Sequence, residues 1–148
     1  MPKFKYRMQN ILTLKETLER QQKAAFSLAM LRVREEEEKL QQLLLRRGKY
    51  ESDLAAASEG TLDLKEITHI KSAIQIMKTL IRDQMFELKK AQDALEVERK
   101  KLDQIMMERK TYEKLREKAF EEFKHELVME DMKVTDEFTS FKYNKMQV

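Results

Sequence analysis

Residues 58–67 read SEGTLDLKEI and contain the strongest turn signal in the chain. Gly60 can adopt the left-handed backbone conformation that commonly ends a helix. Asp63 can cap the N-terminus of a following helix, and Glu66, three residues later, completes a capping-box pattern. Because so short a connection makes two consecutive helices neighbours that run in opposite directions, this stretch predicts an antiparallel helical hairpin.

A heptad pattern of apolar residues follows this turn. Its members are Ile67, Ile74, Ile81, Leu88, Leu95 and Leu102, with Ile70, Met77, Ala91, Ile105, Tyr112 and Ala119 between and after them. Apolar side chains spaced alternately by three and four residues form one stripe along a helix, which is typical of coiled-coil packing. The pattern therefore predicts a second helix over about residues 63–141.

A weaker heptad pattern precedes the turn. It comprises Phe26, Ala29, Val33, Leu40, Leu43, Tyr50, Leu54 and Ala57, and two charged residues, Glu36 and Arg47, interrupt it. Nearer the N-terminus the same spacing recurs one residue out of phase, at Ile11, Leu14, Leu18, Ala25 and Leu28. The change of phase predicts a slip of the heptad register near Ala25. We expect a first helix over about residues 4–57, a turn at about 58–62, and one elongated all-α domain, an antiparallel two-helix coiled coil.

The composition supports this fold class and excludes several classes of function. With 2 Gly, 1 Pro and 39% charged residues, the chain has little material for turns or strands. Its net charge of +3 does not give the strongly basic surface typical of proteins that bind nucleic acid. The absence of cysteine excludes disulfides and fits a reducing compartment. No apolar stretch approaches the ~20 residues that cross a bilayer, so we expect no membrane insertion and no signal peptide.

Residues that carry catalytic or metal chemistry are sparse. The two histidines, His69 and His125, are far apart and lack the paired spacing of metal ligands. No glycine-rich phosphate-binding motif occurs, and a two-helix hairpin offers no closed pocket in which to desolvate a reacting group. The sequence therefore predicts a protein that is not an enzyme, without catalytic residues, cofactor or bound metal.

Both ends of the chain resemble the FliJ family of flagellar export proteins. The resemblance rests on FKYRMQNIL at residues 4–12, on YEKLREK at 112–118 and on EDMKVTDEF at 130–138. It implies an antiparallel coiled coil similar to the central stalk of rotary ATPases. It also implies a cytoplasmic location, peripherally associated with the flagellar type III export apparatus at the inner membrane. The implied partners are the hexameric flagellar export ATPase, the export gate protein and the export chaperones.

Two sets of apolar residues are candidate partner-binding surfaces. In a hairpin, the first helix covers the second only to about Arg116, which leaves an apolar overhang. This overhang and the first residues of the chain form the candidate ATPase surface, which comprises Phe4, Met8, Phe120, Phe123, Leu127, Val134, Phe138 and Phe141. Beside the heptad stripe near the turn, a second set forms the candidate export gate surface: Ala73, Ile76 and Leu80.

Alternatives to these functional interpretations remain open. The overhang can fold back or pair with a second copy of the chain, and the residues near the turn can simply widen the buried face of the helix. A structural coiled-coil spacer or scaffold, with a uniformly polar surface, is the main alternative for the whole protein.

Overall fold

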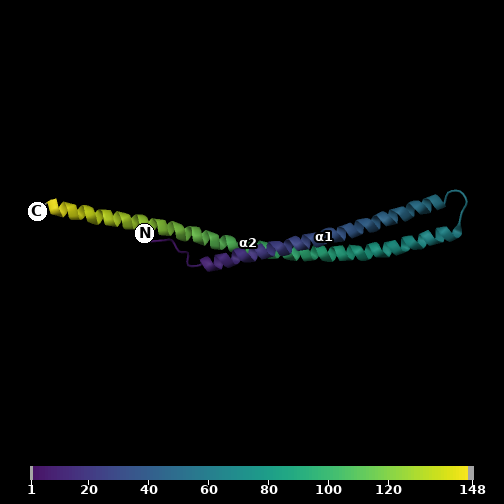
Figure 1. The fold of residues 1–148 in the computed structure, drawn as a ribbon, viewed down its shortest axis with the longest axis horizontal. Helices are drawn as coiled ribbons and strands as arrows, with labels where there is room; N and C mark the ends of the chain where they lie inside the picture. The colour runs from purple at the N-terminus through teal and green to yellow at the C-terminus, as the bar shows by residue number, and fades with distance from the viewer. Residues whose placement is uncertain (1, 147–148) are drawn as a thin grey trace. The chain divides into compact units, whose positions relative to one another are not determined.

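The computed structural model describes residues 2–146, which form two long α-helices packed against each other. Helix α1 spans Gln9–Ala57, and helix α2 spans Leu64–Met146 (Figure 1). They run in opposite directions on either side of a short connection, and no strand occurs in residues 2–146. The predicted all-α helical hairpin is thus confirmed.

The connection between the helices contains the predicted capping residues. Gly60 has a φ of +78°, the left-handed conformation that favours glycine. The carboxylate of Asp63 accepts hydrogen bonds from the backbone N–H groups of Lys65 and Glu66, at 3.1 and 3.4 Å. These bonds satisfy two of the N–H groups that have no partner within the first turn of α2. Local chemistry in the sequence therefore explains where the chain reverses.

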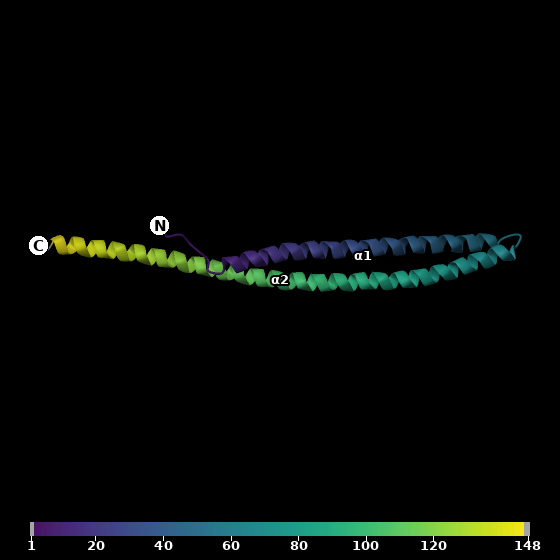
Figure 2. The same ribbon diagram turned by 60° about the horizontal axis from the view of Figure 1, so that its bottom comes forward.

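The chain divides into two compact units, and each contains part of both helices. Unit 2 comprises Gln21–Leu102, in which α1 and α2 run side by side in both views (Figures 1 and 2). Its buried apolar residues are Val33 from α1 and Ile70, Ile74, Met77, Ile81 and Ala91 from α2. Unit 1 comprises the described residues up to Arg20 and from Asp103 onward, and its one buried apolar residue is Leu12. The apolar core of unit 2 is therefore the larger of the two.

The predicted slip of the heptad register in α1 is wrong. We call the stripe of heptad positions along which the two helices pack the seam. Leu14 and Leu28, expected in the seam, are 55% and 68% exposed. The buried positions are instead Leu12 and Glu19, which continue the phase of Val33 without interruption. The helix keeps one register because polar side chains at its seam positions find partners on α2, as described below.

The helix bounds differ from the expected ones at two ends. Helix α1 begins at Gln9, whereas residues 2–5 have no regular secondary structure and Tyr6 accepts a hydrogen bond from the N–H of Gln9 at 3.0 Å. Helix α2 continues to Met146, beyond the expected end near Phe141. No glycine or proline follows Gly60, so nothing in the sequence ends α2 earlier.

Candidate functional site

An aromatic cluster joins the start of the chain to α2 within unit 1. The ring of Phe4 makes an edge contact with Phe120, with the ring centroids 5.1 Å apart. It also lies 5.5 Å from the ring of Phe123, and the guanidinium of Arg116 lies 6.0 Å from its centroid. Three of the eight residues of the candidate ATPase surface thus pack on one another.

Residues 2–8 form a segment that we call the N-terminal strap. Besides Phe4, it is held by Tyr6, whose hydroxyl donates a hydrogen bond to the backbone oxygen of Tyr112 at 3.1 Å. Non-helical backbone advances up to about 3.3 Å per residue, whereas a helix advances 1.5 Å. The strap therefore reaches farther along α2 than a helix of the same residues. For this reason the overhang expected after Arg116 has a partner in the chain as far as Phe123.

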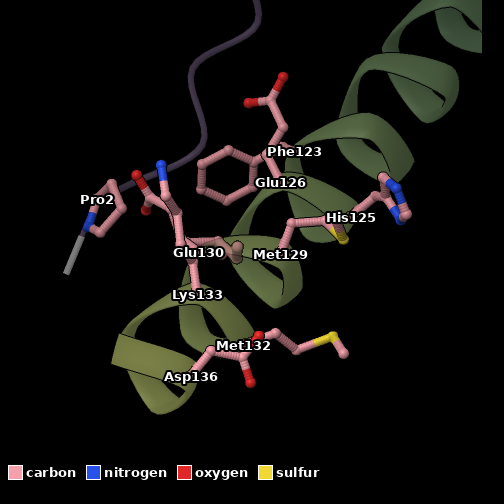
Figure 3. A pocket seen from close by; sticks show the side chains of 10 residues that line it. Pro2, Phe123, His125, Glu126, Met129, Glu130, Met132, Lys133 and Asp136 are labelled. Atoms are coloured by element: carbon pink, nitrogen blue, oxygen red, sulfur yellow. The ribbon is translucent and has the colours of Figure 1, made fainter. Parts of the chain in front are cut away.

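A shallow hollow continues along α2 from the strap. It is lined by Pro2 and by α2 side chains between Phe123 and Asp136, Leu127 among them, and has a volume of about 740 Å³. Figure 3 shows Pro2 on the side of Phe123 and Glu126, while His125 projects away from it. This open surface could hold a segment of a partner protein, but it does not enclose a small molecule.

The remaining part of α2 has no cover from the rest of the described chain. Every residue from Val128 to Met146 is exposed. Three apolar members of the candidate ATPase surface lie in this part of α2: Val134, Phe138 and Phe141. Their spacing of i, i+4 and i+7 places them on one helix face, and we call them the C-terminal stripe. Met8, at the end of the strap, is also exposed. The structure thus separates the candidate ATPase surface into an internally packed part and an exposed part.

The candidate export gate surface lies on α2 in unit 2. Ile76 is 59% exposed and Leu80 is also exposed, whereas Ala73 is half-buried. The neighbouring Ile74 is buried in the seam. A wider buried face therefore accounts for Ala73 but not for Ile76 and Leu80, which remain accessible to a partner.

Polar pairs across the two helices occupy seam positions in each unit. In unit 1, Lys15 pairs with Glu108 at 2.8 Å, and the Nε of Arg109 lies 2.6 Å from the carboxylate of Glu19. Arg109 also pairs with Glu113, at 2.8 Å. Because each partner satisfies a charge that would otherwise be buried alone, these pairs allow charged residues to lie in the interface.

Unit 2 contains two equivalent pairs of glutamine and glutamate. The amide of Gln84 on α2 donates to the backbone oxygen of Glu36 on α1 at 3.0 Å and to its carboxylate. In the same way, Gln22 on α1 donates to the backbone oxygen of Glu98 on α2 at 3.1 Å and to its carboxylate. The pairs lie two heptads apart on each helix. Only the interruption of the seam by Glu36 indicated such contacts in the sequence.

These contacts change the acidity of their carboxyl groups. The hydrogen bond from Gln84 lowers the pKa of Glu36, and that from Gln22 lowers the pKa of Glu98. The hydrogen bond from Lys15 lowers the pKa of Glu108. Each bond favours the ionised form, which therefore persists in the folded protein at pH values below the usual pKa of 4.5.

We therefore expect thermal stability to fall as the pH drops below 4.5, because carboxyls with a lowered pKa in the folded state must then be protonated. Their contribution is present above the unfolded pKa and is lost as the pH falls through the folded pKa. Thermal unfolding followed by circular dichroism across this range measures the effect. Gln84→Leu should weaken the acid dependence, and an unchanged dependence in this variant would contradict the assignment to Glu36.

The described residues offer no site for a metal ion. Within residues 2–146, no group of three or more His, Asp or Glu side chains is arranged to hold one. Over the same residues, neither helix contains a stretch both long and apolar enough to cross a membrane.

A family model described as flagellar FliJ protein matches residues 4–147, nearly the whole chain. Comparisons with curated proteins and with solved structures give no match. The matched range includes the strap from Phe4 onward, both helices and the C-terminal stripe. The chain therefore belongs to the FliJ family of flagellar export apparatus components.

Proposed function

We propose that the chain is a non-catalytic, stalk-like subunit that binds the hexameric flagellar export ATPase through the C-terminal stripe and the adjoining strap. The observation that carries this proposal is the exposure of Val134, Phe138 and Phe141 on a part of α2 that nothing else in the described chain covers. A helix without a packing partner in its own chain gains most of its stability when an apolar face is buried against another surface.

The energetic case for a partner rests on the size of these side chains. Burial of a Val or Phe side chain contributes about 1.5–3 kcal/mol relative to leaving it in water. Three such residues on one helix face supply a compact anchor for binding. A spacer that only holds two bodies apart needs no such apolar stripe, and its surface should be uniformly polar.

The export gate protein and the export chaperones complete the proposed set of partners. Ile76 and Leu80 are the proposed contact with the gate, because both are exposed although they lie beside the apolar core of unit 2. We assign no surface to the chaperones. The protein acts at the cytoplasmic side of the inner membrane and associates with it only through the export apparatus.

Replacing Val134, Phe138 and Phe141 together with serine should reduce binding to the export ATPase by at least about a hundredfold, since hot-spot residues each cost 2 kcal/mol or more. The helix should persist, because none of the three side chains is buried. Pulldown with the purified ATPase hexamer measures binding, and circular dichroism measures helicity.

The matched control is a variant with serine at Met132 and Tyr143. Both residues are exposed, but at about 100° per residue they lie on the opposite side of α2 from the C-terminal stripe. This control should bind like the unchanged chain. Equal binding by the unchanged chain and the triple variant would refute the stripe as the ATPase contact, and failure of the unchanged chain to bind would favour the spacer function.

A further inference from the structure

The charges of unit 2 are segregated along its two helices. Residues 39–50 of α1 and 67–82 of α2 contain no aspartate or glutamate. They carry seven basic residues: Lys39, Arg46, Arg47, Lys49, Lys71, Lys78 and Arg82. The neighbouring stretches, 24–38 and 83–98, carry nine acidic and four basic residues. Although the net charge of the whole chain is only +3, unit 2 therefore contains a basic region, which we call the basic band.

The two halves of the basic band face each other. The connection after Ala57 lies on one side of the band, and the hydrogen bond from Gln84 to Glu36 joins the helices on the other side. Of the seven basic side chains, Lys39 pairs with Glu36 and Arg47 pairs with Glu51. Within residues 2–146, the other five form no ion pair. The band therefore has uncompensated positive charge for an outside partner.

Exposed apolar side chains lie within the same band. They are Leu44 and Leu45 on α1, and Ile76 and Leu80 on α2. Ile76 and Leu80 are one turn apart on the same helix face. A large apolar residue that stays exposed next to unpaired positive charge is typical of a protein interaction surface rather than of a solvated helix face.

A groove connects the basic and apolar parts of this surface. One hollow of about 550 Å³ includes Lys39 and Arg46 in its lining, and a second of about 680 Å³ includes Leu80. The two hollows share Leu43 and Gln84, so they adjoin at the helix interface. The groove thus has Lys39 and Arg46 on its α1 side, and Leu80 and Phe86 with Arg82 on its α2 side.

We propose that the basic band docks an amphipathic α-helix of a partner protein, with apolar residues on one face and aspartate or glutamate beside it. This inference rests on the proposed gate contact at Ile76 and Leu80 and adds the chemistry of the partner segment. The apolar face of that helix packs on Leu80 and Ile76, and its carboxylates lie against Arg46 and Lys49. Complementary charges steer the encounter and fix its register.

The groove favours a protein segment over a phosphate-rich surface. Asp83 and Glu87 line its distal part, and both would repel anionic lipid headgroups or nucleic acid. A helix can place a basic or neutral residue at that point, whereas a uniform phosphate surface cannot. Insertion into a bilayer would also need one continuous apolar face, which Ile76 and Leu80 alone do not provide.

The test uses the full chain and two synthetic 20-residue helical peptides that share one leucine stripe. One peptide carries glutamate on one side of the stripe and glutamine at the remaining positions, and the other carries lysine in place of each glutamate. We expect the glutamate peptide to bind in fluorescence anisotropy and the lysine peptide not to bind. In the variant Arg46→Glu with Lys49→Glu, affinity for the glutamate peptide should fall by at least about tenfold, because two charges are reversed beside it and the local net charge changes by four units.

The matched control reverses the same charge outside the basic band, in the variant Arg34→Glu with Lys100→Glu. All four substituted residues are exposed, so circular dichroism should show unchanged helicity in both variants. The control should keep most of the affinity for the glutamate peptide. Equal binding of both peptides, or an equal loss in both variants, would overturn the inference. Binding to phosphatidylserine vesicles without binding to the glutamate peptide would overturn it in favour of a membrane.

Two further measurements separate this inference from the proposed gate contact. Two double variants of the chain should no longer bind the cytoplasmic region of the gate protein. One is Ile76→Ser with Leu80→Ser, and the other is Arg46→Glu with Lys49→Glu. If only the first variant loses binding, the gate contact stands and the acidic partner chemistry falls. If the unchanged chain binds the glutamate peptide but not the gate region, the gate contact falls and the basic band remains a docking surface for another acidic helix.

Discussion

Replacing Ile74 with alanine is expected to lower the free energy of unfolding by about 2–4 kcal/mol, because it leaves a cavity in the apolar core of unit 2. Ile74 is 9% exposed and lies in the same seam as the buried Ile70, Met77 and Ile81. Two helices provide few side chains that can move to fill the space. The melting temperature should fall by about 5–15 °C in thermal unfolding followed by circular dichroism.

Ile76→Ala is the matched control for this variant. The substitution is the same and only two positions away, but Ile76 is mostly exposed. Its effect on the free energy of unfolding should stay within about 0.5 kcal/mol. If both variants lowered the melting temperature equally, Ile76 would be part of the core, and the proposal that it binds a partner would lose its basis.

The second large effect is expected at the ion pair between Glu19 and Arg109. Replacing Glu19 alone with leucine should destabilise the protein by about 1–3 kcal/mol, because Arg109 loses a charged partner inside the interface. Glu19 is 7% exposed, and its carboxylate lies 2.6 Å from Arg109. The remaining ion pair with Glu113 limits the loss.

Replacing both Glu19 and Arg109 with leucine should give a protein at least as stable as the unchanged chain. Two apolar residues that fill the same space avoid the cost of desolvating two charges. Thermal unfolding of the two single variants and the double variant forms a double-mutant cycle that measures the coupling. Additive effects of the two substitutions would show that the pair does not determine the packing of α1 on α2.

The aromatic residues at the two ends illustrate how much of the candidate site the sequence could predict. Helical spacing of apolar residues identified Phe120, Phe123 and Phe138 as members of one overhang. Spacing alone did not distinguish those that the strap contacts from those that stay exposed. Phe4 reaches Phe120 and Phe123 because the chain before α1 is not helical, and Phe138 lies beyond its reach. The assignment of these residues to partners stays a prediction.

The seam of α2 and the turn were determined by the sequence itself. Ile70, Ile74, Met77 and Ile81 are buried as their spacing predicted, and Asp63 caps α2. Both features depend on residues close together in the chain, so the local pattern contains the information that determines them. The same is true of the all-α fold, since almost no residue in either helix interrupts it.

The phase of the first part of α1 was decided only by the tertiary structure. Two stripes one residue apart compete there, and the apolar one, with Leu14, is not the one that is buried. Lys15 and Glu19 lie in the seam because their charges are paired with those of Glu108 and Arg109 on α2. These partners are about ninety residues away in the sequence. No local pattern in α1 contains that information, because the energy of a buried charge depends on the partner that the fold brings to it.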